Sequence, residues 1–277
     1  MTTAPRVWLI TGASRGLGRA FAEAALAAGD RVVAISRTPE PLGGDSLAIA
    51  ADVTDRAAVF AAVEQAVAHF GRLDVVVNNA GAMWLGAIEE FSEDEARAAM
   101  ELNFFGALWV TQAVTPHLRE RGGRLLQVSS VAGVATGATA GMYSAAKFAL
   151  EGMSEALAQE LALFDVKVTI VEPGGYWTDL YRTGMFNTEP LEAYAPLRSG
   201  DGGEDESVDS DPKLAAEAVM KLVDSEDPPL RLVLGSAVLD AMIAVSKQRI
   251  ATWEQWEEVS RAAEHAIPMP AGYLDGA

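Results

Sequence analysis

The first thirty residues combine a short apolar run, a glycine-rich turn and an alanine-rich stretch. Residues 7–10 have the length and composition of a buried strand, and residues 11–18 then read Thr-Gly-Ala-Ser-Arg-Gly-Leu-Gly. Residues 20–28 are typical of a helix that ends at Gly29. A strand, a glycine turn and a helix in this order predict a βα unit whose turn approaches a dinucleotide pyrophosphate at the helix N-terminus. A plain strand–helix turn is the alternative.

Short apolar runs and amphipathic stretches alternate along the rest of the chain. Strands are expected at residues 31–36, 47–50, 73–78, 124–129, 167–171 and 230–234. Helices are expected at residues 57–70, 91–100, 104–120, 143–163 and 215–223. Strands rich in Val, Ile and Leu that alternate with helices predict a parallel sheet covered on both faces. We therefore expect an α/β fold of Rossmann type: a doubly wound, parallel, seven-stranded sheet in three α/β/α layers.

Composition narrows the class of protein. The 277 residues suit a single domain over 1–277, and the absence of cysteine excludes disulfides and thiolate metal sites. The three histidines lie far apart in the sequence, so no metal site is expected. The formal net charge of −18 argues against nucleic acid as a partner. No apolar run is long enough to span a membrane, and the first strand leaves no room for a signal peptide, so a cytoplasmic enzyme is expected.

Tyr143 and Lys147 lie four residues apart, thirteen residues after Ser130. On a helix this spacing puts the phenol and the ammonium on one face. A nearby ammonium favours the phenolate, so we expect Lys147 to lower the pKa of Tyr143 towards working pH. A tyrosine tuned in this way can act as a general acid or base. Taken alone, the pair would more often be a solvated surface contact, and Ser130 a turn serine.

These motifs together resemble the compact, single-domain branch of the short-chain dehydrogenase/reductase family. The matching residues are the glycine turn at 11–18, the Asn-Asn-Ala-Gly run at 78–81, Asn103, Ser130, Tyr143, Lys147, and Pro173-Gly174 followed by Thr178. Their order and spacing agree from residue 6 to about residue 180. The segment from Val168 to Leu180 and the long tail are most similar to bacterial reductases near the 17β-hydroxysteroid dehydrogenase branch.

The resemblance implies a catalytic tetrad of Asn103, Ser130, Tyr143 and Lys147. Ser130 and Tyr143 would bind the ketone oxygen, Lys147 would bind the nicotinamide ribose, and Asn103 would hold a water that links Lys147 to solvent. The alternative for Asn103 is a helix N-cap. Cofactor contacts are implied at Gly12, Ser14, Arg15, Gly16, Leu17, Gly18, Ser36, Arg37, Asp52, Val53, Asn79, Ala80, Gly81, Tyr143, Lys147, Pro173, Gly174 and Thr178.

Charge indicates which nicotinamide cofactor is bound. In this family an acidic residue at the end of the second strand accepts the adenosine ribose hydroxyls of NAD, but that position here is Ser36, followed by Arg37. Arg37 and Arg15 could instead bind a 2′-phosphate. The sequence therefore favours NADP(H), although either arginine alone could be a solvated surface charge. Asp52 is a candidate adenine contact or part of a helix N-cap region.

The substrate site is expected to be apolar. Its candidate residues are Trp84, Val131, Met142, Trp177 and Tyr181, each of which could alternatively belong to the core. Residues of about 180–212 are expected to form a substrate lid that includes a flexible acidic loop at 199–211, for which an idle surface insertion is the alternative. A C-terminal helical extension is expected at about 236–265, and the family usually forms homodimers or homotetramers.

Three functions remain open at this point. The first is an NADPH-dependent carbonyl reductase that acts on a hydrophobic ketone with Tyr143 as general acid. The second is the same chemistry run as an NADP-dependent secondary alcohol dehydrogenase, because a catalyst does not set direction. The third is a non-catalytic NADP(H)-sensing regulator, although such relatives typically lose the tyrosine or the lysine. The expected partner is therefore a small-molecule ketone or alcohol, with neither nucleic acid nor a membrane.

Overall fold

The computed structural model describes residues 4–198, 209–265, 267–270 and 273. Its backbone forms two compact units, Met1–Leu239 and Asp240–Ala277, which are described separately here. The first unit carries the main sheet and all the motifs identified above. The second contains most of α9 (Ser236–Gln255) and α10 (Glu257–Ala262), where a helical extension is expected.

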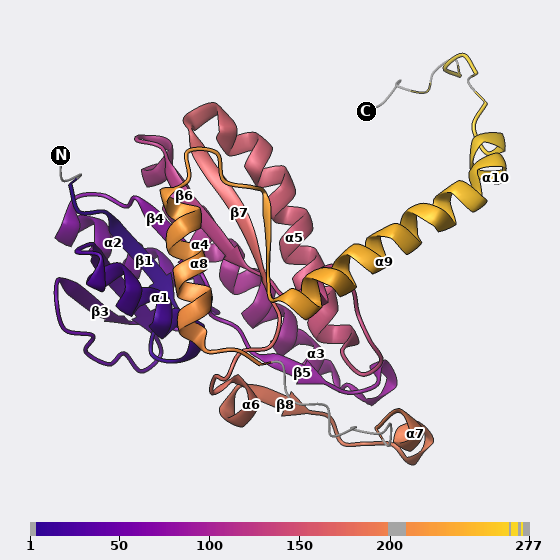
Figure 1. Cartoon of the computed structure of the whole chain (residues 1–277), viewed down its shortest axis with the longest axis horizontal. Coiled ribbons are helices and arrows are strands. Elements are labelled where there is room, and N and C mark those ends of the chain that lie inside the picture. The colour runs from indigo at the N-terminus through magenta and orange to yellow at the C-terminus, as the bar shows by residue number, and fades with distance from the viewer. Residues whose placement is uncertain (1–3, 199–208, 266, 271–272, 274–277) are drawn as a thin grey trace. The chain divides into compact units, whose positions relative to one another are not determined.

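The main sheet contains seven parallel strands in the order β3-β2-β1-β4-β6-β7-β9 (Figure 1). The strands are β1 (Val7–Thr11), β2 (Arg31–Ser36), β3 (Ser46–Ala50), β4 (Val75–Asn78), β6 (Gly123–Val128), β7 (Val166–Pro173) and β9 (Arg231–Leu234). The chain moves outward from β1 in one direction and then returns to continue from β4 in the other. This reversal confirms the doubly wound Rossmann-type fold. In sheets of this kind the crevice for ligands lies outside the carboxyl ends of the strands, at the reversal.

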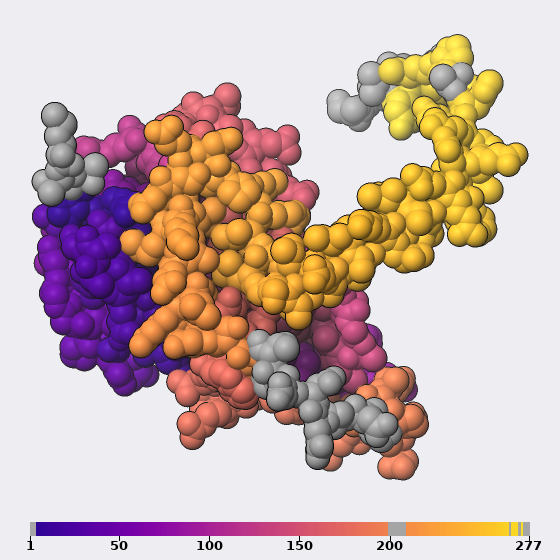
Figure 2. Space-filling view, viewed as in Figure 1, coloured from indigo at the N-terminus to yellow at the C-terminus, as the bar shows by residue number. Residues whose placement is uncertain are grey.

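Helices cover both faces of the sheet. The main ones are α1 (Gly16–Ala27), α2 (Arg56–Phe70), α3 (Glu93–Met100), α4 (Gly106–Arg119), α5 (Gly141–Leu161) and α8 (Pro212–Asp224). One core cluster joins the sheet to α2, α4 and α5, and a second joins its other face to α1 and α8. The α8 side chains lie against the N-terminal part of the chain (Figure 2). The predicted three-layer architecture is therefore confirmed.

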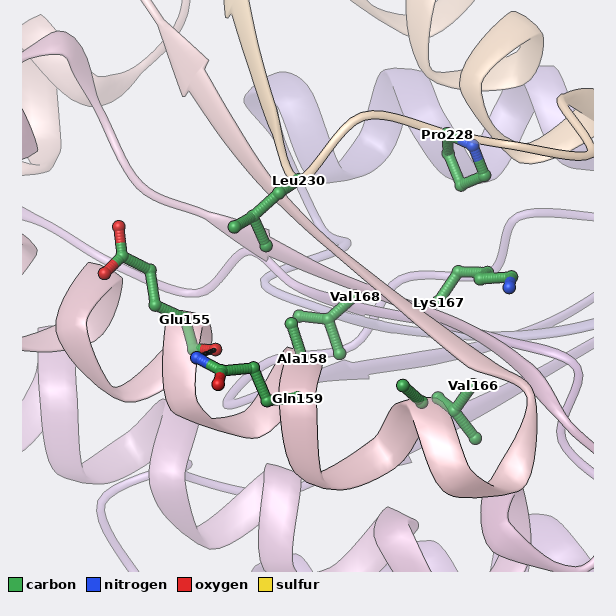
Figure 3. Close-up of a pocket in the computed structure, with 9 residues that line it drawn as sticks. Glu155, Ala158, Gln159, Val166, Lys167, Val168, Pro228 and Leu230 are labelled. Atoms are coloured by element: carbon green, nitrogen blue, oxygen red, sulfur yellow. Dashed lines mark hydrogen bonds between the residues drawn. The ribbon is translucent and has the colours of Figure 1, made fainter.

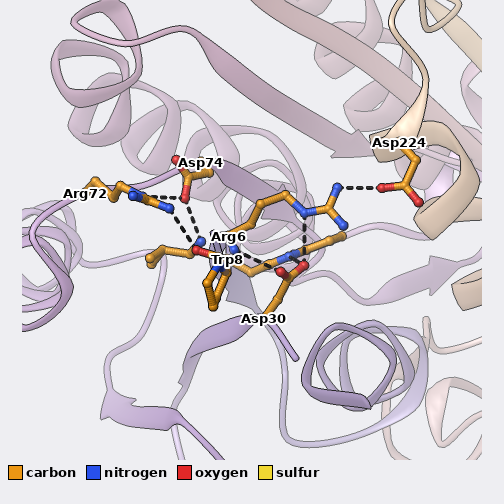
Figure 4. Close-up of polar contacts among 8 residues, drawn as sticks. Arg6, Trp8, Asp30, Arg72, Asp74 and Asp224 are labelled. Carbon is orange, nitrogen blue, oxygen red and sulfur yellow. Dashed lines mark hydrogen bonds and ion pairs between the residues drawn. The ribbon is translucent and has the colours of Figure 1, made fainter. Parts of the chain in front are cut away.

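Polar contacts connect the amino ends of the strands, at the end of the sheet that is remote from the crevice (Figure 4). Asp30 accepts hydrogen bonds from the indole Nε1 of Trp8 at 2.9 Å and from Nε of Arg6 at 3.0 Å. Arg6 also pairs with Asp224 at the end of α8, 2.6 Å away. Asp74 accepts from the Val7 amide at 2.8 Å. These bonds satisfy polar groups at the strand ends and connect the start of β1 to the end of α8. The carboxyl ends of the strands lie at the opposite end of the sheet.

Two local features differ from the sequence predictions. A second, two-stranded parallel sheet pairs β5 (Met83–Leu85) with β8 (Met185–Asn187), and neither strand was predicted. The predicted break between two helices near Asn103 is instead a π-helical turn, Glu101–Phe105, that joins α3 to α4. The alternative of a helix N-cap at Asn103 is therefore wrong.

Candidate active site

The glycine turn joins β1 to α1 at the centre of the crevice. Gly12 has φ +67°, a left-handed conformation that favours glycine. A Cβ on Gly18 would lie 2.4 Å from Nδ2 of Asn79 and 2.5 Å from the Gly12 oxygen, so α1 can approach the turn only because residue 18 lacks a side chain. Nδ2 of Asn79 in turn donates to the Thr11 oxygen at 2.9 Å. The turn is thus built for close backbone approach.

Thr11 also contributes to this arrangement. Its Oγ1 accepts hydrogen bonds from the backbone amides of Asn79 at 3.0 Å and Ala80 at 3.1 Å. These bonds lock the loop after β4 to the turn after β1, so two of the predicted cofactor motifs are held side by side. The sequence analysis did not single out Thr11 as a site residue, although a threonine that ends a strand directly before the glycine turn is a usable signal.

The N-terminus of α1 fits an anionic group. Within the described residues, the N-cap Arg15 provides no side-chain hydrogen bond to the first turn of this helix. First-turn amides and the positive end of the helix dipole suit a phosphate. Thr178 lies beside this turn, because a Cβ on Gly16 would be 3.3 Å from the Thr178 Cβ. The cofactor motif after β7 is therefore brought to the first glycine motif, as the sequence predicts.

The predicted specificity residues lie at the end of β2, after β3 and in the glycine turn before α1. Ser36 ends β2 half-buried, and Arg37 follows it exposed to solvent. Arg15 is also exposed, and its Nη1 donates to Thr183 Oγ1 at 2.5 Å. Asp52 accepts from the Thr54 amide at 3.0 Å, while Asp55, not Asp52, caps α2. Val53 is buried and packs next to Gly106.

Tyr143, Ser130 and Lys147 converge where β6 ends and α5 begins. Ser130 forms a hydrogen bond with Tyr143, and its Oγ also accepts from the Ala132 amide at 3.1 Å. Nζ of Lys147 donates to the Val128 oxygen at 2.9 Å and lies 5.8 Å from the centre of the Tyr143 ring. Tyr143 and Lys147 are both buried. The structure therefore brings these three predicted residues together.

The net shift of the Tyr143 pKa is opposite to the lowering expected from Lys147. Burial raises the pKa of Tyr143 to about 12, although the hydrogen bond with Ser130 works in the opposite sense. Burial also lowers the pKa of Lys147 to about 8, against the charge of Glu151. Withdrawal from water disfavours the charged form of each group, and here it outweighs their neighbours. At neutral pH the pair is therefore a neutral phenol beside an ammonium.

Asn103 is held rigidly in the π-helical turn. Its Nδ2 donates to the Ala99 oxygen at 3.0 Å, and its Oδ1 accepts from the Ala82 amide at 3.1 Å. Gly81 lies between Asn103 and Lys147: a Cβ on Gly81 would be 2.9 Å from Oδ1 of Asn103 and 3.7 Å from Nζ of Lys147. The loop after β4 thus connects the cofactor motif with the catalytic residues.

The predicted substrate residues differ in how far they are exposed to solvent. Val131 and Met142 are half-buried next to Ser130 and Tyr143 in the sequence. Tyr181 is 39% exposed and close enough to Tyr143 to influence its pKa, while Trp177 is 61% exposed. Trp84 is buried and stacks on Phe186, with ring centres 4.8 Å apart. Trp84 is therefore part of the packing of the small sheet.

The segment predicted to form a lid is connected to residues 83–90 of the first unit. It contains α6 (Leu180–Thr183), β8 and α7 (Ala195–Arg198), and Glu90 binds its backbone. Glu90 accepts from the Leu191 amide at 2.9 Å and also contacts Arg198. The hydrogen bond with Arg198 is the main cause that lowers the pKa of Glu90 to about 2. Of the predicted acidic loop at 199–211, residues 199–208 lie outside the described part of the chain.

A hollow of about 530 Å³ lies elsewhere on the first unit (Figure 3). It is bordered by α5, β7 and the segment before β9, with Glu155, Val168 and Leu230 among its lining residues. None of its lining residues belongs to the predicted catalytic or cofactor set. The candidate active site is the region around Tyr143, where Ser130 and Lys147 also lie.

Comparisons with known proteins identify the family of this chain. The family model described as short chain dehydrogenase matches residues 6–185. Oxidoreductase BOA17 of Botryotinia fuckeliana is 38% identical over 93% of this chain and 99% of its own length. A 3-ketodihydrosphingosine reductase of Bacteroides thetaiotaomicron is 39% identical over 88% of this chain and 92% of its own length.

Solved structures give the same result. A short-chain dehydrogenase from Streptomyces avermitilis superposes with a TM-score of 0.87 at 41% identity, and covers 95% of this chain and 100% of that one. A short chain dehydrogenase from Burkholderia cenocepacia, in complex with NADP, has a TM-score of 0.75 at 25% identity, with 92% and 98% of the two chains covered.

The fold and the site define a nicotinamide-dependent oxidoreductase. The chain belongs to the short-chain dehydrogenase family. Among the described residues there is no cluster of His, Asp or Glu side chains that could hold a metal ion. No helix in the described part of the chain is long and apolar enough to cross a membrane.

Proposed function

We propose that this enzyme is an NADPH-dependent carbonyl reductase that reduces a hydrophobic ketone to a secondary alcohol. The observation that carries the proposal is the buried Tyr143 phenol, which is hydrogen-bonded to Ser130 and stands one helical turn before the Lys147 ammonium. Because burial raises the pKa of Tyr143 to about 12, the phenol holds its proton at neutral pH. A protonated phenol is the form that a general acid needs in the reductive reaction.

Each catalytic residue has a distinct part in this proposal. Ser130 and Tyr143 donate hydrogen bonds to the ketone oxygen, and Tyr143 gives up its proton as negative charge develops there. Lys147 stabilises the resulting phenolate, because its ammonium shares the same face of α5. Asn103 holds the loop after β4 against the turn that precedes α4. When bound, the nicotinamide supplies the hydride.

The residues of the crevice fit NADPH as the cofactor. The glycine turn and the first turn of α1 would hold the pyrophosphate, with Thr178 beside them. Ser36 leaves the end of β2 without a carboxylate that would repel a 2′-phosphate, and the exposed Arg37 and Arg15 are available to bind one. The Burkholderia relative that was solved with NADP supports the same assignment.

An apolar ketone is the proposed substrate class. Met142, Val131 and the exposed Trp177 and Tyr181 offer apolar and aromatic surface around Tyr143. A relative named for the reduction of a 3-keto compound supports a ketone as the reacting group. We also propose that the protein works as a homodimer or homotetramer in the cytoplasm.

Cofactor preference is tested by replacing both residues at the end of β2. The variant Ser36→Asp/Arg37→Ala introduces a carboxylate and removes a cation, so we expect the NADPH-to-NADH ratio of kcat/KM to fall by about a hundredfold, since charge-assisted hydrogen bonds to phosphate are lost. Arg97→Ala is the matched control, because it removes an exposed arginine of α3, away from β2 and from the predicted lid. An unaltered ratio in the double variant would contradict the NADPH assignment.

A further inference from the structure

The end of β6 holds α5 through three consecutive residues. The Val128 oxygen accepts a hydrogen bond from Lys147, Oγ of Ser129 donates to Oε1 of Glu151 at 2.6 Å, and Ser130 bonds to Tyr143. On α5 these partners are four residues apart, so they occupy one face of the helix. Two of the three contacts involve the residues of the proposed reaction. The third involves Glu151, which the proposed reaction does not use.

Glu151 is a buried carboxylate with a tightly built environment. Its exposed fraction is 3%, and its second oxygen pairs with Arg231 of β9. A Cβ on Gly133 would lie 2.1 Å from Oε1 of Glu151, so the glycine of the turn after β6 leaves room for the carboxylate. A carboxylate in such a place is costly unless it is paired and hydrogen-bonded, as this one is.

The charges around Glu151 come from several elements. The titratable groups that contact or face it within the described residues are Lys147 and Glu155 on α5, Glu172 on β7 and Arg231 on β9. β6 and the turn after it contribute the uncharged Ser129 and Gly133. Arg231 also binds Glu172 at 2.7 Å and Glu155 at 2.6 Å. Burial raises the pKa of Glu172, and the Arg231 hydrogen bond opposes this change.

We propose that Glu151 is a positioning residue of the active site, whose buried carboxylate fastens α5 to β6 and places a negative charge one helical turn from Lys147. It does not contact the reacting atoms and acts through Lys147. The inference rests on the proposed function only in that Lys147 must be charged for cofactor binding and catalysis. Burial by itself lowers the pKa of Lys147, and Glu151 is the group whose charge counters that effect.

The test compares Glu151→Gln with Glu155→Gln. Both remove a carboxylate that binds Arg231, but Glu155 lies one turn further along α5, is half exposed, and is absent from the groups that influence Lys147. Two quantities are measured against pH: kcat/KM for NADPH with a ketone, and the dissociation constant of NADPH from its fluorescence. Melting temperatures report the purely structural cost.

Each profile should change at high pH, where Lys147 loses its charge, and this part of the profile is its basic limb. Loss of the Glu151 charge should move the midpoint of the basic limb to lower pH by about one unit. Glu155→Gln should leave the midpoint within about 0.3 units of its wild-type position. Glu151→Asp keeps the charge and should keep the limb near its wild-type position even where kcat falls. A limb that stays in place in Glu151→Gln would overturn the proposal. If Glu151→Gln does not fold, Glu151→Asp decides: a shift of its basic limb to lower pH by about one unit would overturn the proposal.

The two proposals fail in different ways. If the wild type binds NADPH but reduces no ketone, the proposed function fails, and the binding profile still decides the part played by Glu151. If the wild type reduces ketones and the limb does not respond to Glu151→Gln, only the positioning proposal fails. A lower melting temperature with both limbs in place would assign Glu151 a structural part alone, and this outcome also overturns the proposal.

Discussion

At the scale of single residues, burial sets the charge states of the active site. Tyr143 and Lys147 are 8% and 4% exposed, and withdrawal from water pushes their pKa values in opposite directions, to about 12 and about 8. The sequence indicated that the two side chains share a helix face, but it contained no measure of how deeply that face is covered. The predicted lowering of the Tyr143 pKa was wrong for that reason.

The pKa of Lys147 predicts how activity depends on pH. Below about pH 8 Lys147 carries its charge, and above that pH it becomes neutral, so kcat/KM for NADPH should fall on the basic side with a midpoint near pH 8. Steady-state rates between pH 6 and about pH 10 measure this profile. Lys147→Arg keeps a charge throughout the range and should lose the limb, even if its rate is lower. A limb with the same midpoint in that variant would assign the titration to another group.

At the scale of secondary-structure elements, close approach explains the glycine turn. A Cβ on Gly18 would meet Asn79 and the Gly12 backbone within 2.5 Å, which a flexible side chain alone could not relieve. Gly18→Ala should therefore weaken NADPH binding at least about tenfold, as expected for α1 displaced from its phosphate site. Fluorescence titration with NADPH and thermal melting measure the two effects.

Gly152→Ala is the control for that substitution. Gly152 lies in the middle of α5, and a Cβ there would have no atom within 4 Å. Alanine should stabilise the helix by about 0.5–1 kcal/mol and leave NADPH binding unchanged. If Gly18→Ala and Gly152→Ala bind NADPH equally tightly, close packing at Gly18 is not needed for cofactor binding.

The sequence predicted the elements that strong periodicity defines. All seven strands of the main sheet, the glycine turn and α5 were expected, because long runs of Val, Ile and Leu between helices leave few alternatives. The pairing of β5 with β8 was missed because each strand has three residues and the partners are about a hundred residues apart. The π-helical turn at Asn103 was missed because a single widened turn has no periodicity of its own, so the sequence suggested a break between two helices there. The lining of the substrate site remains a prediction.

At the scale of the whole molecule, the first unit contains the parts that the proposed reaction needs. Both large core clusters lie between Val7 and Leu234, and Asn103, Ser130, Tyr143 and Lys147 lie within the same span. Among the described residues of α9, none is buried. Val238, which packs against Gly174, belongs to the first unit.

A chain that ends at Leu239 should therefore fold and bind NADPH. We expect its dissociation constant for NADPH to stay within about threefold of the full-length value, because truncation tolerance follows the burial of the segment removed. Fluorescence titration gives the constant, and light scattering of both chains reports any change in the number of subunits. Loss of a cooperative melting transition would mean that the second unit is needed for folding.

The central claim is that Tyr143 donates a proton to a ketone while NADPH is consumed. The most direct test follows NADPH absorbance with wild type and Tyr143→Phe on aryl, alicyclic and steroid ketones, with NADH in parallel. The wild type should reduce at least one bulky apolar ketone with NADPH. Tyr143→Phe should bind NADPH nearly as tightly but turn over at least about a thousandfold more slowly, since it lacks the general acid. Retained turnover in Tyr143→Phe would contradict the account.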